Sequence, residues 1–304
     1  MCQNWNAIMT KNGSVMEGKL IAMRIGFVFT NYNNAHYTKE NVISISRIKN
    51  YEVLPVIIVD NNSNQSDKDE LRKIEDEFAN VKIIFNNENI GYFAGLNVGI
   101  LEIRNHYPDI EHIVIGNNDL EFPSDFFDHI INKSHLFNDY PVICPNLVTL
   151  DGEHQNPHVL SSISVARELI WDIYYTNYLI AICIRVLARF TKRFTRRRDH
   201  EYHRIPQIIY QGYGACYILG PIFFKHFDNL WAPTFLLGEE LFLSKQLQDK
   251  GLHLFYEPSI YVNHHDHASM SKLISSDLWK IARDSHKIYR KYVNPFSSKI
   301  LRNN

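Results

Sequence analysis

The segment PVIIVDNNS, residues 55–63, joins a run of apolar, mostly β-branched residues to a cluster of turn-forming polar residues. Three further apolar runs are RIGFVFT (24–30), VKIIF (81–85) and HIVIG (112–116). Helical patterns separate the four runs, roughly over residues 39–49, 67–78 and 93–104. Short apolar strands that alternate with helices predict a mostly parallel sheet covered by helices on both faces.

In sheets of this kind, ligands bind at the carboxyl ends of the strands. The polar residues that follow the predicted strands are therefore candidates for a binding site: Asn31, Asp60, Asn89 and the run Asn117-Asn118-Asp119. We expect these side chains to lie along one edge of the sheet.

The second half of the chain is less regular. We expect strands at residues 141–148, 253–256 and 259–263, a mostly helical stretch over 164–198, a helix over 239–250 and a closing amphipathic helix over 272–293. Together the two halves predict a single α/β domain.

The composition is that of an ordinary globular protein. The 304 residues are 45% hydrophobic and 21% charged, with a formal net charge of −1. This balance excludes nucleic-acid binding driven by overall charge, while local basic patches stay possible. The four cysteines, Cys2, Cys144, Cys183 and Cys216, are widely spaced, which predicts reduced thiols and a cytosolic protein. Residues 1–22 carry no signal-peptide pattern and are expected to form a poorly ordered tail, so that Met23 is a candidate natural start.

Two acidic residues at strand ends are candidates for chemistry. Asp119 offers a hard oxygen ligand to Mg²⁺ or Mn²⁺, which one or two carboxylates and substrate phosphates commonly hold. A strand-end turn stabilised by its own side chains is the alternative. Asp60 can accept hydrogen bonds from a nucleoside, or cap the next element.

The segment NIGYFAGLNVG, residues 89–99, opens a predicted helix. Gly91 and Gly95 allow close backbone approach, and a helix N-terminus favours a negatively charged partner such as a diphosphate. Tight packing of helix on sheet is the alternative, and both can hold. The spacing matches neither GxGxxG nor the P-loop, which disfavours a dinucleotide site or a nucleoside triphosphatase.

Two later segments also carry candidate groups. Glu239 and Glu240 begin a predicted helix, where acids are common for dipole reasons, but one of them could act as a general base. His264, His265 and His267 follow a predicted strand and are either extra ligands for a metal or phosphate, or part of a surface loop.

These segments occur in an order that resembles family 2 glycosyltransferases of the GT-A fold, especially bacterial rhamnosyltransferase-like enzymes that build surface polysaccharides. In the first half the matching segments are FVFTNYNN, IIVDNNS, NENIGYFAGLNVGI and IGNNDLEF. In the second half they are YGACYILG, FLLGEELFLSKQLQDKG and HHDHASMSK. Together they span most of residues 24–271, and their order is more specific than any single segment.

The resemblance implies roles for individual residues. Asp60 would contact the nucleoside base, Asp119 would hold the metal, His265 would assist at the metal or diphosphate, and Glu240 would be the general base, with Glu239 as the alternative. The remaining donor-site residues it implies are Thr30, Asn31, Asn89, Gly91, Gly95, Asn97, Asn117 and Asn118.

The resemblance also implies an organisation and a reaction. Residues 23–150 would bind the nucleotide sugar, residues 151–271 would face the acceptor, and residues 272–304 would close the same domain. The enzyme would move a hexosyl or rhamnosyl group from a UDP- or dTDP-sugar to a hydroxyl group of a glycan or lipid-linked acceptor, with inversion and with Mg²⁺ or Mn²⁺ as cofactor.

Two positions depart from the family pattern. Asn117 replaces the first acid of the DxD motif, and Glu replaces the more frequent Asp at the base position. The first departure leaves a catalytically inactive nucleotide-sugar or glycan-binding module as an alternative. A nucleotidyltransferase is disfavoured, because no basic glycine-rich loop follows the first strand.

The stretch over residues 168–198 combines apolar and aromatic residues with a dense basic run. Its basic residues are Arg185, Arg189, Lys192, Arg193, Arg196, Arg197 and Arg198. The apolar part is too short and too interrupted to span a bilayer. We expect this stretch to lie on an anionic membrane, on the inner face of the cytoplasmic membrane, with a packing helix or an oligomer contact as alternatives.

Overall fold

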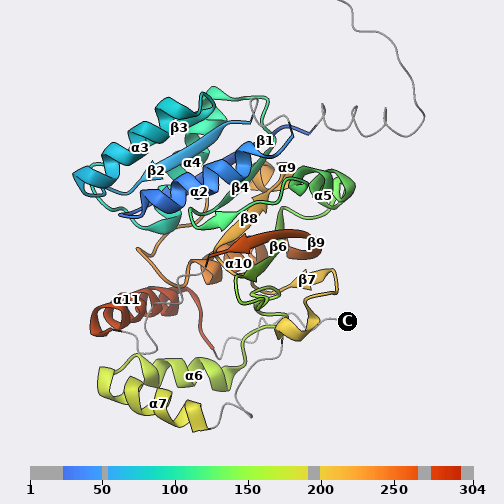
Figure 1. Ribbon diagram of the computed structural model, residues 1–304. Coiled ribbons are helices and arrows are strands. Elements are labelled where there is room, and N and C mark those ends of the chain that lie inside the picture. Colours follow the sequence, from blue (N-terminus) through green and yellow to red (C-terminus); the bar gives the residue numbers. More distant parts are fainter. Residues whose placement is uncertain (1–22, 50–53, 191–198, 266–274, 296–304) are drawn as a thin grey trace, which may run out of the picture.

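The computed structural model of the protein describes residues 23–49, 54–190, 199–265 and 275–295. The predicted tail, Cys2, His267 and the basic residues 192–198 lie outside the described residues. Within them, a nine-stranded mixed sheet runs through the molecule in the order β3-β2-β1-β4-β8-β6-β9-β5, with β7 beside β9 (Figure 1).

The strands have the following bounds. They are β1 Ile25–Asn31, β2 Val56–Asp60, β3 Val81–Phe85, β4 His112–Asn117, β5 Leu120–Glu121, β6 Val142–Thr149, β7 Gln207–Ile209, β8 Cys216–Leu219 and β9 Leu254–His264. The helices are α2 Ala35–Ser46, α3 Gln65–Glu77, α4 Tyr92–His106, α5 Phe126–Asn132, α6 Val165–Tyr174, α7 Tyr178–Phe190, α9 Pro221–His226, α10 Glu239–Gln248 and α11 Ser276–Tyr292. Two short 3₁₀ helices are η2 Ser134–Asn138 and η3 Asp199–Tyr202.

The first four strands and the three helices between them confirm the pattern predicted from the sequence. β1 pairs in parallel with both β2 and β4, and β2 pairs in parallel with β3. The antiparallel strand β8 was not predicted, and it joins this parallel half to β6. The fold is therefore the mixed, mostly helix-covered α/β sheet expected from the alternating strands and helices.

One prediction in the second half is wrong. The expected break between two strands near Pro258 does not occur, and β9 runs unbroken through it. Instead, the pairing of β6 with β9 shifts register between Pro145 and Asn146, whose partners are Glu257 and Tyr261. A bulge of this kind accommodates a proline, because the proline N–H that a regular ladder would need is missing.

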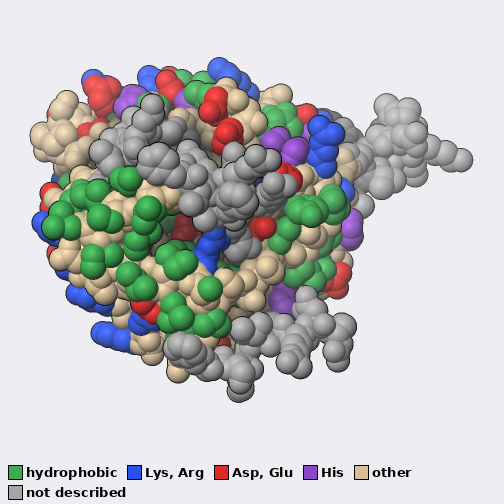
Figure 2. Space-filling view, turned by 90° about the horizontal axis from the view of Figure 1, so that it is seen from below, with side chains coloured by type: hydrophobic (Ala, Val, Ile, Leu, Met, Phe, Trp, Pro, Cys, Tyr) green, Lys and Arg blue, Asp and Glu red, His purple; other side chains and the backbone are tan. Residues whose placement is uncertain are grey.

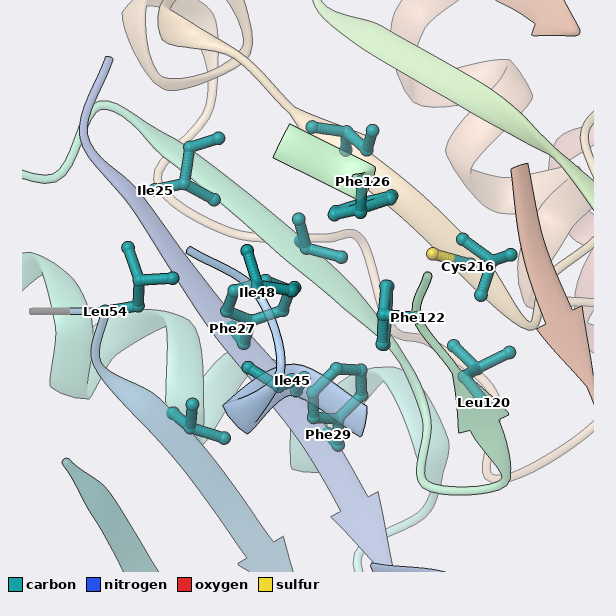
Figure 3. Packing of buried hydrophobic residues seen from close by; sticks show 14 of the residues in the cluster. Ile25, Phe27, Phe29, Ile45, Ile48, Leu54, Leu120, Phe122, Phe126 and Cys216 are labelled. Carbon is teal, nitrogen blue, oxygen red and sulfur yellow. The ribbon is translucent and has the colours of Figure 1, made fainter. Parts of the chain in front are cut away.

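Alternate residues of the strands enter two hydrophobic layers. Phe27 and Phe29 of β1 point to one face, where Phe122 lies 5.5 and 5.8 Å from them between ring centroids (Figure 3). α2, α3 and α5 contribute buried side chains to this layer. Val28 and Val59 point to the other face, against α4, and α9 and α10 contribute to that layer. Gly99 allows α4 to approach closely, since a β-carbon there would lie 2.3 Å from Val28 Cγ1.

Helices α6 and α7 form a hairpin at the edge of the molecule farthest from β3 (Figure 1). The predicted helical stretch is interrupted at residues 175–177, and Asn177 Oδ1 accepts the backbone N–H of Leu179 at 2.8 Å. α11 holds α6 in place. The Arg290 guanidinium lies 2.7 Å from the carboxylate of Glu168 and 2.5 Å from that of Asp172.

Candidate functional site

The predicted site residues of the first half meet at the carboxyl ends of β1, β2 and β4. Asn31 pairs with Asp60 across one ladder, and Thr30 pairs with Asn117 across the other. The parallel register therefore places four of the predicted residues in one row.

Asn31 and Asn118 are buried at the centre of a network of side-chain hydrogen bonds. Asn31 Nδ2 donates to Asp60 at 2.9 Å and to Asp67 at 2.7 Å. Asn118 Nδ2 donates to Asn31 at 3.1 Å and to Thr38 at 2.7 Å. Both amides thus hold the strand ends to α2 and α3, and their contacts with a donor remain predictions.

Asp60 is also buried. Its carboxylate accepts hydrogen bonds from the backbone N–H of Ser63 at 3.0 Å and from the Ser63 hydroxyl at 2.5 Å, in addition to Asn31. The segment DNNS therefore forms a compact turn around this carboxylate, as the capping alternative expects. Recognition of a base by Asp60 remains a prediction.

The N-terminal end of α4 is occupied by protein contacts. The backbone N–H of Gly91 donates to Asn89 Oδ1 at 3.0 Å, and that of Tyr92 donates to the carbonyl oxygen of Phe235 at 3.1 Å. Gly91 has φ +91, and a β-carbon there would lie 2.1 Å from the Phe235 carbonyl oxygen. The glycine therefore serves a close approach of two backbone segments.

The other two residues predicted from this segment also make packing contacts. The Asn97 amide exchanges two hydrogen bonds of 2.8 Å with the backbone of Leu230. A β-carbon on Gly95 would lie 2.9 Å from Thr30 Cγ2. Thr30, Asn89 and Asn117 are the other predicted donor residues with partly exposed side chains. Unlike Asn97, none of them has a described hydrogen bond to residues 230–235.

Asp119 lies beside His264. Asp119 Oδ1 and His264 Nε2 are 3.2 Å apart, and His264 Nδ1 lies 2.7 Å from Gln155 Oε1. The short ladder of β5 with β9 sets this proximity, since Leu120 pairs with His264. His264 is almost fully buried, so its orientation is fixed by the fold.

The hydrogen bond to Gln155 determines what His264 presents to Asp119. Because Gln155 Oε1 can only accept, His264 Nδ1 carries a proton, and a neutral ring then has a lone pair at Nε2. A lone pair facing a carboxylate oxygen at 3.2 Å calls for a positive charge between them or on the ring. A proton on Nε2 or a divalent cation would supply it.

These residues fit a metal that the protein and its substrate hold jointly. Among the described residues no group of three His, Cys, Asp or Glu side chains could hold a cation by itself. One carboxylate and one imidazole leave the remaining coordination positions to substrate phosphates, an arrangement common for Mg²⁺. Mn²⁺ also accepts carboxylate oxygens, and imidazole suits transition metals.

His265, the histidine marked by the resemblance, lies elsewhere. Its ring nitrogens are 3.8 Å from Glu40 and 3.5 Å from Glu121, while its backbone N–H donates to the carbonyl oxygen of Asp119 at 2.9 Å. The residue next to the Asp119 carboxylate is therefore His264. The doublet at 264–265 was a visible signal, but which histidine faces Asp119 depends on the strand register.

Glu240 lies against the loop that precedes β8. A β-carbon on Gly214 would lie 2.6 Å from Glu240 Oε1, and the Gly214 carbonyl oxygen accepts the Tyr92 hydroxyl at 2.8 Å. Burial raises the pKa of Glu240, while backbone N–H groups of Glu240 and Gly214 stabilise its ionised form. This glycine makes room for the carboxylate beside the first residue of α4.

Glu239 is buried on the same first turn of α10. Among the described residues its Oε1 has no hydrogen-bond partner. Burial, and then repulsion from Glu240, raise the pKa of Glu239 to about 8. At neutral pH this carboxyl is therefore mostly protonated and poorly suited to accept a proton.

Tyr213 lies next to the histidine that faces Asp119 and directly precedes the glycine that contacts Glu240. Its ring centroid lies 6.0 Å from that of His264, and the next residue is Gly214, which Glu240 contacts. Burial raises the pKa of Tyr92 well above its usual range, with further contributions from Cys216, Glu239, Glu240 and Asp119. The adjacent residues Tyr213 and Gly214 therefore lie against His264 and Glu240, respectively.

Comparisons with known proteins show the family and the fold of the chain. The profile of a family described as "Glycosyl transferase family 2" matches residues 27–201, more than half of the chain. No curated protein sequence matches this chain significantly.

Solved structures with a similar fold have low sequence identity to this chain. One is GalNAc-T7 with UDP, GalNAc and Mn²⁺, with 13% identity and a TM-score of 0.55 over 80% of this chain and 44% of that one. A mannosyltransferase from Pyrobaculum calidifontis in complex with GDP-Man and Mn²⁺ has 14% identity and a TM-score of 0.51 over 87% of this chain and 62% of that one.

A third is TarS 1-349 of S. aureus in complex with UDP-GlcNAc, with 11% identity and a TM-score of 0.53 over 85% of this chain and 64% of that one. The chain thus spans between 44% and 64% of the lengths of these structures. The likeness establishes the GT-A fold.

Proposed function

We propose that this chain, which belongs to glycosyl transferase family 2, transfers a sugar from a nucleotide diphosphate to a hydroxyl group of an acceptor. The observation that carries the proposal is the Asp119–His264 pair, with the Glu240 carboxylate nearby, at the carboxyl end of β4. This is the edge at which α/β sheets bind ligands. The similar structures hold UDP with GalNAc, GDP-Man or UDP-GlcNAc, which supports a nucleotide-sugar donor.

Each group has a distinct role in the proposed reaction. Asp119 and His264 would hold the divalent metal, Mg²⁺ or Mn²⁺, which when bound supplies Lewis-acid stabilisation of charge on the departing diphosphate. Glu240 would take the proton of the acceptor hydroxyl as the hydroxyl oxygen attacks the anomeric carbon of the donor sugar. A single displacement of this kind inverts the anomeric configuration and has an oxocarbenium-like transition state.

The donor would lie over the row formed by β1, β2 and β4. Thr30, Asn89 and Asn117 are partly exposed there and are proposed to contact it directly. Asn31, Asp60 and Asn118 are buried, and their hydrogen bonds position the strand ends. The proposed donor is a UDP- or dTDP-sugar, and the proposed reaction is the transfer of its hexosyl or rhamnosyl group.

The function is tested by incubating the protein with a panel of UDP-, dTDP- and GDP-sugars, with Mn²⁺, with Mg²⁺ and with EDTA. We expect one donor class to bind and to be slowly hydrolysed when no acceptor is present, and both signals to disappear with EDTA. Release of the nucleoside diphosphate is the measurement.

Two other results would contradict the proposal in different ways. Binding of a nucleotide sugar without hydrolysis or transfer to any glycoside would favour the inactive binding module that Asn117 leaves open. Binding and hydrolysis that are unaffected by EDTA would contradict the metal role of Asp119 and His264.

We also propose that the protein binds an anionic membrane surface through the α6–α7 hairpin. The large apolar residues exposed on it are Leu169, Ile170, Ile173, Leu179, Ile180, Val186 and Leu187. In sequence the hairpin leads directly into the basic residues between 192 and 198. The described helices include none long and apolar enough to cross a bilayer. An apolar surface (green at the left of Figure 2) that is followed in sequence by a basic run supports interfacial binding.

Liposome co-sedimentation tests this binding. The protein should bind anionic vesicles more strongly than neutral ones, and less strongly as salt is raised, because exposed charges are screened. Replacing Arg193, Arg196, Arg197 and Arg198 with Gln should remove most of the difference between the two lipids, since each basic residue contributes on the order of 1 kcal/mol.

A matched control uses apolar residues that are equally exposed elsewhere. Leu101 on α4 and Leu150 after β6 are 59% and 71% exposed, against 69% and 64% for Leu179 and Leu187. Replacing Leu179 and Leu187 with Gln should weaken sedimentation, and replacing Leu101 and Leu150 with Gln should not. Equal binding by all variants would leave the hairpin as a packing or oligomer element.

A further inference from the structure

The loop that leads into β8 carries a glycine at each end, Gly212 and Gly214, and side chains from three elements hold it. The Tyr217 hydroxyl donates a hydrogen bond to the Gly212 carbonyl oxygen at 2.9 Å. The residue between the two glycines donates its backbone N–H to Asn156 Oδ1 at 2.8 Å. The Tyr92 hydroxyl of α4 donates to the Gly214 carbonyl oxygen at 2.8 Å. Each of the three loop residues therefore has a backbone group bound by a side chain.

Gly214 is also the residue over which Glu240 lies. A β-carbon on Gly214 would lie 2.6 Å from Glu240 Oε1, so only a glycine leaves room for the carboxylate in this position. Hydrogen bonds from the backbone N–H groups of Gly214 and Glu240 favour the ionised form of that carboxylate. Gly214 thus has its carbonyl oxygen bound by Tyr92 and its N–H directed at Glu240.

The direction of the Gly214 N–H depends on what binds the loop. Glycine has more backbone freedom than any other residue, because no β-carbon restricts its dihedral angles. The peptide groups of Gly214 are therefore oriented by their hydrogen-bond partners, and the Tyr92 hydroxyl is one of them, at an ordinary hydrogen-bond length. Removing this hydroxyl should let the Gly214 N–H turn away from the carboxylate.

Tyr92 also holds the segment that leads into α10. Its backbone N–H donates to the Phe235 carbonyl oxygen at 3.1 Å. Further along this segment, Leu237 has φ +71 and Gly238 has φ +95. A left-handed conformation is unusual for leucine and persists only where surrounding contacts hold it. One residue of α4 therefore contacts both the loop beneath Glu240 and the segment that precedes it.

The surroundings of Glu240 make its ionisation sensitive to single hydrogen bonds. The titratable groups near it are Glu239 on the same helix, Tyr92 of α4 and Tyr217 of β8. None of these three groups carries a positive charge, so hydrogen bonds are left to stabilise the carboxylate against the cost of burial. Burial raises the pKa of Glu240, and the two backbone N–H groups lower it.

We propose that Tyr92 is a positioning residue for the general base: its hydroxyl fixes Gly214 so that the Gly214 N–H stabilises the Glu240 carboxylate. The inference rests on the proposed function in one respect, which is that Glu240 is the base of that transfer. The effect on the carboxyl itself requires no catalysis. Phenylalanine at this position would keep the size of the ring and lack the hydrogen bond to Gly214.

The ionisation of Glu240 is measured directly in Tyr92→Phe, without any reaction. Protein labelled isotopically at the glutamate carboxyl carbon is titrated by NMR, and the Glu240 signal is the one that is missing from Glu240→Gln. The acid dissociation constant of Glu240 should fall roughly tenfold or more in Tyr92→Phe, because a hydrogen bond to a charged group commonly stabilises it by at least that factor. The carboxyl then ionises at a higher pH than in the wild type.

Tyr217→Phe is the matched control. It removes a tyrosine hydroxyl from a carbonyl oxygen of the same loop, but at Gly212 rather than at Gly214. Both variants lose one hydrogen bond, so their melting temperatures should fall by similar amounts. The titration of Glu240 should move far less in Tyr217→Phe than in Tyr92→Phe. Equal shifts in the two variants would overturn the assignment of this role to Tyr92.

The pH profile of activity separates positioning from a purely structural role. In Tyr92→Phe the low-pH limb of kcat/KM should move to higher pH together with the NMR titration. The high-pH plateau, and the affinity for the nucleoside diphosphate with Mn²⁺, should change little. A loss of turnover at every pH with the limb unmoved would overturn the proposed role.

The two measurements also distinguish this inference from the proposed function. If the Glu240 titration shifts in Tyr92→Phe but the wild type neither hydrolyses nor transfers any nucleotide sugar, the proposed function fails and the positioning of the carboxylate stands. If the wild type transfers a sugar and Glu240 titrates alike in both proteins, the proposed function stands and the role of Tyr92 is overturned.

Discussion

Asp119→Ala is expected to lose the Mn²⁺-dependent part of nucleotide-sugar binding and, with it, the transfer activity. Asp119 is the carboxylate that faces His264, and no group of three metal-binding side chains among the described residues could replace it. Loss of an outer partner of a metal ligand alone typically costs about 10–100-fold in affinity or activity, so loss of the carboxylate itself should cost at least that much. Titration of the nucleoside diphosphate with and without Mn²⁺ is the measurement.

The two neighbouring histidines separate this prediction from a general effect on the fold. His264→Ala should weaken the Mn²⁺-dependent binding, because His264 Nε2 lies 3.2 Å from Asp119 Oδ1. His265→Ala should change it little, because the ring nitrogens of His265 lie 3.8 Å from Glu40 and 3.5 Å from Glu121. The reverse order would restore the histidine that the resemblance marks. Unchanged affinity in the Asp119 variant would rule out this carboxylate as the principal metal ligand.

The arrangement of the first half was predictable because its signals are local. Apolar runs such as PVIIVD must lie inside a sheet, and the polar residues after them reach its carboxyl edge once the strands are parallel. Their roles were harder to predict, because an amide at a strand end can contact a ligand or hold neighbouring elements. Asn31 and Asn118 bond each other and α2, which depends on contacts between residues far apart in the sequence.

The second half was less predictable because its contacts depend on register and on closely packed loops. Which histidine faces Asp119 is decided by the pairing of Leu120 with His264 in a two-residue strand, β5. The shift opposite Pro145 keeps β9 continuous where the sequence predicts a break. A cavity of about 470 Å³ beside α6 is lined by residues from three separate segments, and no spacing in the sequence marks them as a group.

Glu240→Gln is expected to retain nucleotide-sugar binding and to lower turnover by roughly 10²-fold or more, the usual effect of removing a general base. The amide keeps the size of the side chain over Gly214 but cannot accept the acceptor proton. Burial raises the pKa of Glu240, so activity should increase with pH as this carboxyl ionises. The low-pH limb of kcat/KM should follow this ionisation and be absent in the variant.

Glu239→Gln is the matched control, since it changes the adjacent residue in the same way. With a pKa raised to about 8, Glu239 is mostly protonated at neutral pH, and an amide resembles that neutral form. The variant should therefore keep most of its activity.

The stability of Glu239→Gln should also differ from that of the wild type in its dependence on pH. A carboxyl whose pKa is raised on folding binds its proton more tightly in the folded state, so stability falls as the pH rises from 4.5, where the unfolded carboxyl ionises, to about 8, where the folded one does. The wild-type melting temperature should fall over this range, and that of Glu239→Gln should fall less. An inactive Glu239→Gln beside an active Glu240→Gln would assign the base to Glu239.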